Sequence, residues 1–307
     1  MRVLIMGAGG VGGYLGARLA SHGMDVGFVA RGAHLAAMRR RGLISRGVEP
    51  LTLMDVHCDD NPRAWGPADV VLFCVKLYDT ASAAAALAPA VAADTVIITL
   101  QNGINSVADL QALLPVTHVM GGAAYFPANI TAPGEVTYLG KIASKPHFAF
   151  GDMGTGVSSR AQTIADAFNA AGLEVQVSDD TERMLWEKFL LIAGTSAATA
   201  LTRQPMGPVR MDDDMRWLLR EAIQETRNVA LASGVTLSDT VVDDVMDTLA
   251  GNPADGKSSQ LVDLENGRRL ELLGLSGAVV ERGQTLGIET PVHRTVLAAL
   301  KPFIDGV

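Results

Sequence analysis

The chain has 307 residues, enough for two domains, and its hydrophobic content of 48% excludes a disordered or fibrous protein. The formal net charge of −8 argues against nonspecific binding to nucleic acid or to an anionic membrane, so an anionic ligand needs a local cationic patch. The two cysteines, Cys58 and Cys74, lack the spacing of a metal site, and we expect no bound metal.

The sequence also predicts where the protein resides. The first predicted strand begins at residue 2, so we expect no secretory signal peptide. An uncharged helical run at residues 189–202 is too short to span a bilayer. Because scarce cysteine indicates a reducing compartment, we expect a cytoplasmic protein without a membrane partner.

The N-terminal residues carry the pattern of a dinucleotide-binding turn. An apolar run at residues 3–6 precedes the sequence GAGGVG, and apolar residues then recur at helical spacing. In such a unit Gly7 permits the tight turn, Gly9 lets the backbone approach a pyrophosphate, and Gly12 lets helix and strand pack closely. Free N–H groups at the helix N-terminus would hold the phosphates, so Gly10 and Val11 join the cofactor assignment. The alternative is a glycine turn with only a structural role.

The residue after the second predicted strand points to one of the two nicotinamide cofactors. That strand, residues 26–30, ends before Arg31, about twenty residues beyond the glycines, where the adenosine ribose is usually recognised. An acidic residue there would favour NAD, whereas a guanidinium suits a 2′-phosphate, so Arg31 favours NADP(H). We interpret Arg39, Arg40 and Arg41, on the next helix, as a solvated face.

Polar residues follow two further apolar runs. Residues 68–75 and 95–100 are typical of buried parallel strands, and Lys76 and Asn102 come soon after them. Ligands of an open parallel sheet bind beyond the carboxyl ends of its strands, so both side chains are candidates for the cofactor site. The alternative for Lys76 is an ordinary solvated strand end.

Weaker β patterns precede a change in composition. An irregular segment carries strand-like pieces at residues 51–57, and strands are predicted at 119–124 and 174–177. Residues 135–139 and 148–151 suggest a small antiparallel addition, and residues 160–171 form a helix by pattern.

From residue 178 onward β patterning almost disappears. Helices are predicted at residues 181–201, 213–234, 239–250, 260–287 and 293–304. We therefore predict a dinucleotide-binding α/β domain over residues 1–179 and an all-α substrate and catalytic domain over residues 180–307. Substrate is expected to meet the cofactor between them, and the helical half is the candidate for a homodimer interface.

The helical half holds three candidates for chemistry. Lys188 ends a charged stretch and precedes an uncharged run, so it is either a catalytic ammonium or a side chain that extends to water. Ser259 directly precedes the helix predicted for residues 260–287, and Glu271 lies within it. Ser259 could cap that helix and Glu271 could face solvent, and spacing does not decide between these roles.

The order of these motifs resembles the ketopantoate reductase (2-dehydropantoate 2-reductase) family over almost the whole chain. The resemblance rests on GAGGVGG near the N-terminus, Lys76 after a strand, QNG at 101–103, WEK at 186–188, and SS at 258–259 followed by Glu271. It implies a Rossmann-type N-terminal domain, an all-α C-terminal domain, and NADPH-dependent reduction of a 2-keto acid to a 2-hydroxy acid.

By position, the resemblance implies that Lys188 is the catalytic lysine and Glu271 the active-site glutamate. It implies that Asn102 and Ser259 hold the substrate and that Lys76 lies beside the nicotinamide. Hydride transfer leaves negative charge on the carbonyl oxygen, which an ammonium can bind and then protonate, an effect worth roughly 10²–10⁴-fold. Glu271 would orient the lysine and accept a hydrogen bond from the product hydroxyl.

Two positions depart from the ketopantoate-specific enzymes, in which asparagines usually stand one and two helical turns after the lysine. Here these positions hold Ile192 and Ser196, and we assign Ser196 to the substrate site. Isoleucine removes an amide and makes that side of the pocket drier, so a more hydrophobic 2-oxo acid is an alternative to 2-dehydropantoate. A non-catalytic NADP(H)-sensing protein of the same fold is the other alternative.

Overall fold

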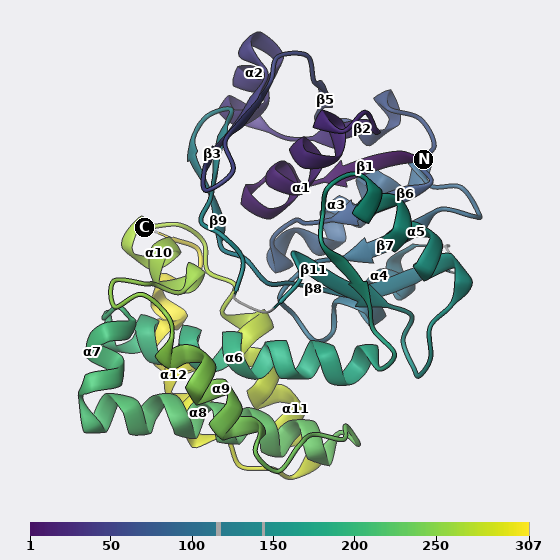
Figure 1. Ribbon diagram of the computed structural model, residues 1–307. Helices are drawn as coiled ribbons and strands as arrows, with labels where there is room; N and C mark the ends of the chain where they lie inside the picture. The colour runs from purple at the N-terminus through teal and green to yellow at the C-terminus, as the bar shows by residue number, and fades with distance from the viewer. Residues whose placement is uncertain (115–117, 143–144, 307) are drawn as a thin grey trace. The chain divides into compact units, whose positions relative to one another are not determined.

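The computed structural model describes residues 1–114, 118–142 and 145–306 (Figure 1). These residues divide into two compact units. The first, which we call the sheet unit, consists of Met1–Gln101 and Asn105–Thr181. The second, the helical unit, consists of Asn102–Ile104 and the chain from Glu182 onward. The fold class predicted from the sequence, an α/β parallel-sheet domain followed by a helical region, is confirmed.

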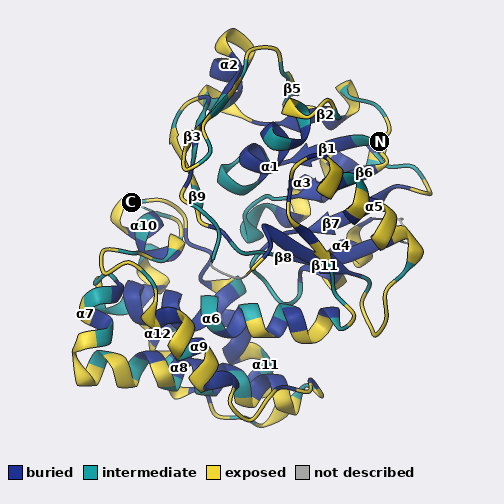
Figure 2. Cartoon of the chain, in the orientation of Figure 1, coloured by how far each residue is buried: buried dark blue, intermediate teal, exposed yellow. Residues whose placement is uncertain are grey.

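Eight of the described strands form the main sheet of the first unit, in the spatial order β12-β11-β8-β7-β6-β1-β2-β5. Their bounds are β1 (Arg2–Met6), β2 (Asp25–Val29), β5 (His57–Asp59), β6 (Val70–Phe73), β7 (Val96–Thr99), β8 (Val119–Ala124), β11 (Phe148–Gly151) and β12 (Val175–Val177). Neighbouring strands are parallel except for β8 and β11, which are antiparallel. Strands in the middle of a parallel sheet are buried on both faces. This explains why every residue of β6 and β7 is buried and why all of them except Thr99 are apolar (Figure 2).

A second sheet in the same unit has the order β4-β3-β10-β9 among the described strands. Its strands are β3 (Leu43–Gly47), β4 (Leu51–Leu53), β9 (Ala128–Ala132) and β10 (Glu135–Tyr138). The single antiparallel addition predicted from residues 135–139 and 148–151 is wrong. β10 pairs with β9 and β3, whereas β11 pairs with β8 and β12 in the main sheet. Each strand pairs with segments that are distant in sequence. The alternation of apolar and polar residues within a strand does not predict which segments these are.

The sheet unit contains five α-helices and three short 3₁₀ turns within its described residues. They are α1 (Gly10–Ser21), α2 (Gly32–Arg41), α3 (Thr80–Leu87), α4 (Ser106–Leu113), α5 (Ser159–Ala170), η1 (Pro62–Ala64), η2 (Leu77–Asp79) and η3 (Ala88–Ala90). The buried ring of Tyr14 on α1 stacks on Tyr138 of β10, with ring centroids 3.9 Å apart, and meets Phe126 edge-on at 5.2 Å. These aromatic contacts attach α1 to the second sheet.

The second unit is helical in its described part. Its elements are α6 (Thr181–Thr202), α7 (Met206–Met211), α8 (Asp213–Ala232), α9 (Val241–Ala250), α10 (Ser259–Glu265), a π-helical turn η4 (Leu273–Gly277), α11 (Ala278–Leu286), α12 (Pro291–Leu300) and η5 (Lys301–Phe303). α6 begins in the sheet unit at Thr181 and continues into this one. Among the described residues, no helix has the length and apolar character that a membrane crossing needs.

The continuous helix predicted for residues 260–287 is wrong. α10 ends at Glu265, and Gly267 takes a positive φ of 60°, a conformation that glycine adopts without strain. The N–H of Arg268 then donates to the carbonyl of Asp263 at 2.8 Å, which closes the helix end. The chain resumes helical structure only at η4 and α11, so residues 266–272 form a connecting segment.

Candidate functional site

The glycine turn after β1 leaves a helix N-terminus uncapped by any side chain. Gly7, with φ of 100°, turns the chain, and the N–H groups of Gly7 and Ala8 donate to the carbonyl of Val29 at 3.3 and 2.9 Å. α1 then begins at Gly10, with Gly9 as its N-cap and no side-chain hydrogen bond at that cap. The first N–H groups of a helix have no intrahelical acceptor, so this end presents donors and a positive dipole to an anion.

Three glycines of this turn differ in what surrounds them. A Cβ on Gly12 would overlap the carbonyl oxygen of Gly7, and a Cβ on Gly10 would overlap the carbonyl of Ala128 on β9. A Cβ on Gly9 would meet no heavy atom within 4 Å. Gly10 and Gly12 are therefore required for packing, whereas the space beside Gly9 is open. The turn fits a dinucleotide pyrophosphate, because the main chain at Gly9 can be approached closely.

Gly10 has a packing role that the sequence does not predict. The glycine pattern assigns this residue to the cofactor, and the structure adds a second reason for glycine there, the close approach of β9 to α1. The signal was unreadable in the sequence because β9 lies more than a hundred residues downstream and carries no strong strand pattern.

Several predicted site residues follow strands of the main sheet that lie side by side. β7, β6, β1 and β2 are consecutive and parallel, so their carboxyl ends share one edge. Arg31 follows β2, and half-buried Lys76 follows β6. The guanidinium Nη1 of Arg31 lies 3.8 Å from Oδ2 of Asp79, at the end of η2. The loop after β6 therefore contributes a charged partner for Arg31 that sequence reasoning missed.

A buried amide holds the loop after β6 in place. Gln101, which follows β7, donates through Nε2 to the carbonyl of Val75 at 3.1 Å and to Oγ1 of Thr80 at 2.8 Å. Thr80 in turn donates to the carbonyl of Leu77 at 2.8 Å. Both polar side chains are buried, so removing either would leave unsatisfied partners in the interior. The segment that carries Lys76 and Asp79 is thus anchored from the adjacent strand.

The arginines of α2 do more than face solvent, so the solvated-face interpretation is incomplete. Arg39 pairs with Asp59 at the end of β5 at 2.7 Å, and Arg41 pairs with Glu135 of β10 at 3.4 Å. Arg39 and Arg41 remain about half exposed, so each pair contributes little to stability. They connect α2 to both sheets of this unit.

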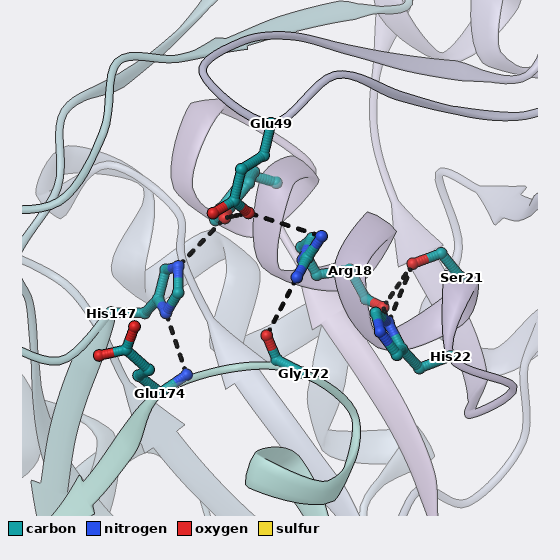
Figure 3. Close-up of polar contacts among 8 residues, drawn as sticks. Arg18, Ser21, His22, Glu49, His147, Gly172 and Glu174 are labelled. Carbon is teal, nitrogen blue, oxygen red and sulfur yellow. Dashed lines mark hydrogen bonds and ion pairs between the residues drawn. The ribbon is translucent and has the colours of Figure 1, made fainter.

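A chain of polar contacts involves the side chains of Tyr14 and Arg18 on α1 (Figure 3). The N–H of Glu174 donates to Nδ1 of His147 at 3.0 Å, so the ring proton is on Nε2, which lies 3.1 Å from the hydroxyl of Tyr14. That hydroxyl donates to Glu49 at 2.9 Å, and Arg18 lies 3.5 Å from the same carboxylate. Burial lowers the pKa of His147 and raises the pKa of Tyr14, so both groups are uncharged at neutral pH.

The predicted site residues Lys188 and Ser196 share one face of α6 with Ile192. Lys188, Ile192 and Ser196 are four residues apart, and side chains at this spacing line up along a helix. Lys188 and Ile192 are half-buried, and Ser196 is buried. The hydroxyl of Ser196 has no hydrogen-bond partner among the residues the structure describes.

The capping alternative for Ser259 is wrong, because its neighbour caps the helix. Ser258 is the N-cap of α10 and accepts from the N–H of Leu261 at 3.1 Å. Its hydroxyl also lies 2.7 Å from that of Thr199 on α6, which ties the two helices together. Ser259 is the first residue of α10 and is exposed.

Glu271 is buried rather than solvated, with 7% of its surface exposed. It lies in the segment between α10 and η4, and its carbonyl accepts from the N–H groups of Gly274 and Leu275 at 3.0 and 3.1 Å. A continuous helix would have held Ser259 and Glu271 about 18 Å apart along its axis. The break at residues 266–272 removes that constraint. A π-helical turn, which here begins two residues after Glu271, is also a feature frequent at functional sites.

Asn102 directly follows Gln101 but is grouped with the helical unit. It is half-buried, and nearby Ile104 packs against the core of that unit.

No cluster of three or more His, Cys, Asp or Glu side chains suited to a metal ion occurs in the described parts of the chain.

Comparison with known proteins gives a consistent result over both units. The family model described as "Ketopantoate reductase PanE/ApbA" matches residues 3–152, and "Ketopantoate reductase PanE/ApbA C terminal" matches residues 180–303. The chain is 32% identical to 2-dehydropantoate 2-reductase of Archaeoglobus fulgidus, covering 100% of this chain and 99% of that protein. It is 35% identical to the enzyme of the same name from Halobacterium salinarum, with 96% of each covered.

A solved structure agrees with these relatives. The chain resembles a ketopantoate reductase family protein of Ralstonia eutropha JMP134 with a TM-score of 0.89 and 33% identity. The match covers 99% of this chain and 98% of that one.

Proposed function

Because this chain belongs to the ketopantoate reductase family, we propose that it reduces a 2-keto acid to a 2-hydroxy acid with NADPH, and that 2-dehydropantoate is its first candidate substrate. The observation that carries the proposal is likeness along the full chain to proteins named 2-dehydropantoate 2-reductase. Both family models match, so the likeness includes the glycine turn and the segments with Lys188 and Glu271.

In this proposal the sheet unit holds the cofactor. The N–H groups of Gly9, Gly10, Val11 and Gly12 bind the pyrophosphate at the N-terminus of α1, and Arg31 binds the 2′-phosphate. The open space beside Gly9 and the absence of a side-chain cap at that residue support the first assignment. Lys76 and Asn102 are assigned to the nicotinamide end of the cofactor.

The bound nicotinamide supplies the hydride that reduces the keto carbon. The ammonium of Lys188 binds the carbonyl oxygen, stabilises the negative charge that develops there, and then transfers a proton to it. Acid catalysis of this kind is worth roughly 10²–10⁴-fold in rate. Glu271 orients the lysine and accepts a hydrogen bond from the product hydroxyl, while Asn102 and Ser259 bind the substrate. Charge-assisted hydrogen bonds to its carboxylate contribute about 1.5–3 kcal/mol each.

A second candidate substrate, a more hydrophobic 2-oxo acid, follows from the side chains on α6. Ile192 stands one turn after Lys188, where it offers neither donor nor acceptor to a polar substrate. Ser196, two turns after Lys188, contributes a buried hydroxyl without a partner among the described residues. A site that cannot form a hydrogen bond to a substrate hydroxyl has little preference for a hydroxylated keto acid such as 2-dehydropantoate over one without the hydroxyl.

The test is NADPH oxidation measured with 2-dehydropantoate and with 2-keto acids that carry branched aliphatic or aromatic side chains. We expect turnover with at least one of them, and Ile192→Asn should shift the ratio of kcat/KM values towards 2-dehydropantoate. Leu191→Asn is the matched control, since Leu191 is also half-buried on α6 but points to another face. NADPH binding without turnover of any keto acid would contradict the proposal and favour a sensing protein.

A further inference from the structure

The residue proposed to read the 2′-phosphate has an acidic partner. Nη1 of Arg31 lies 3.8 Å from Oδ2 of Asp79, and the two side chains are 57% and 37% exposed. They come from loops that follow β2 and β6, the two strands that flank β1. The carboxylate therefore stands at the edge of the sheet where the glycine turn also lies, and it is open to solvent and ligand.

A carboxylate and a guanidinium at this place favour different nucleotides. A ribose 2′-hydroxyl can donate a hydrogen bond to a carboxylate, which is why an acidic residue there favours NAD. A 2′-phosphate is attracted by the guanidinium and repelled by the carboxylate. An exposed ion pair contributes little to stability, so a ligand phosphate can separate Arg31 from Asp79 at small cost.

The position of Asp79 is fixed by the fold. Its N–H donates to the carbonyl of Lys76 at 2.9 Å, and its own carbonyl accepts from the hydroxyl of Ser82 at 3.0 Å. The next residue, Thr80, is held by the buried amide of Gln101. A carboxylate on such an anchored turn cannot move far from an incoming phosphate, so its charge acts on the ligand.

We propose that Asp79 is a specificity-determining residue that weakens the preference for NADPH and makes NADH a usable cofactor of this chain. The inference rests on the proposed function, because it assumes that the glycine turn binds a nicotinamide dinucleotide. It adds that the charge balance between Arg31 and Asp79 sets the ratio of the two affinities.

The experiment is fluorescence titration of the full chain with NADPH and with NADH, without any keto acid, so that no turnover is needed. Asp79→Asn should raise the affinity ratio of NADPH to NADH by about tenfold, as expected when one like charge near a phosphate is removed. The shift should shrink as salt is added. Asp79→Glu keeps the charge and should keep the ratio near that of the unmodified chain.

Asp94→Asn is the matched control. Asp94 is exposed and precedes β7, so it lies at the amino ends of the parallel strands. The glycine turn lies at their carboxyl ends, so this variant makes the same change of charge at the opposite edge of the sheet. An unchanged ratio in Asp79→Asn, or a shift towards NADH, would overturn the inference while leaving the proposed function intact. Failure of the unmodified chain to bind either dinucleotide would overturn the proposed function and this inference with it.

Discussion

The two units place their candidate groups by different means. In the sheet unit, Arg31 lies more than forty residues before Lys76 and Asp79, and the three come to one edge because β2 and β6, the strands before them, are parallel and flank β1. The glycine turn offers main-chain N–H groups rather than side chains. In the helical unit, Lys188, Ile192 and Ser196 share a single helix face, and the side chain of Lys188 carries the proposed acid catalysis.

This difference predicts different effects of substitutions in the two units. Where the main chain binds a ligand, a substitution acts through shape, and its effect depends on the space beside each residue. Where side chains do the chemistry, a substitution removes a reacting group and leaves the fold in place. The predictions below test that contrast.

The largest effect is expected at Lys188. Lys188→Ala removes the proposed acid, so kcat should fall at least hundredfold, within the range for a positioned acid, while NADPH affinity changes less than about twofold. Steady-state kinetics and fluorescence titration measure the two quantities. Lys301→Ala, at an exposed lysine of η5, is the control and should change neither. Unchanged turnover in Lys188→Ala, or an equal loss in both variants, would remove Lys188 from the mechanism.

The next effect concerns stability in acid. His293 of the helical unit is fully buried, and burial lowers its pKa from 6.5 to about 4. Its Nε2 donates to the carbonyl of Ala222 at 2.9 Å, and Nδ1 lies 3.1 Å from the hydroxyl of Ser276. The unfolded chain binds the proton more readily, so His293 should reduce the free energy of unfolding as pH falls from 6.5 to 4, by on the order of 3 kcal/mol.

Urea unfolding of the unmodified chain and of His293→Gln, followed over this pH range, checks the effect. Glu225, which accepts from the N–H groups of Val292 and His293, has a pKa raised by burial and acts in the opposite direction, so the difference between variants isolates the histidine. Parallel curves of unfolding free energy against pH for the two proteins would refute this account of His293.

The smallest effect distinguishes two adjacent glycines of the turn. Gly10→Ala forces a methyl group onto the carbonyl of Ala128 and should cost about 1–3 kcal/mol of stability, the usual cost of overpacking. Gly9→Ala enters open space, so stability should change by less than about 1 kcal/mol while NADPH affinity falls. Thermal unfolding and titration separate the two effects. Equal losses of stability in both variants would show that Gly9 is also a packing residue.

The sequence predicted the sheet unit better than the helical unit, for a physical reason. The strand–turn–helix at the N-terminus is specified locally, by an apolar run and by glycines whose spacing has a steric meaning. The buried strands β6 and β7 were equally clear because both faces are covered and their sequences are nearly all apolar. Helix existence in the second unit was also predicted, because the apolar spacing there is regular.

What could not be predicted depends on partners distant in sequence. The pairing of β10 with β3, the contact of β9 with Gly10 and the pair formed by Arg31 and Asp79 all join segments that no local pattern relates. The break after α10 was missed because its residues continue a helical pattern, and Gly267 alone is a weak signal of a helix end.

The central claim is that hydride passes from a nicotinamide held by this chain to the carbon of a 2-keto acid. It is tested most directly with NADPH that carries deuterium at the transferred position, with the product examined by mass spectrometry. The account predicts a 2-hydroxy acid that contains one deuterium on the carbon bearing the hydroxyl. A product without the label, or no product from any 2-keto acid while NADPH is bound, would contradict it.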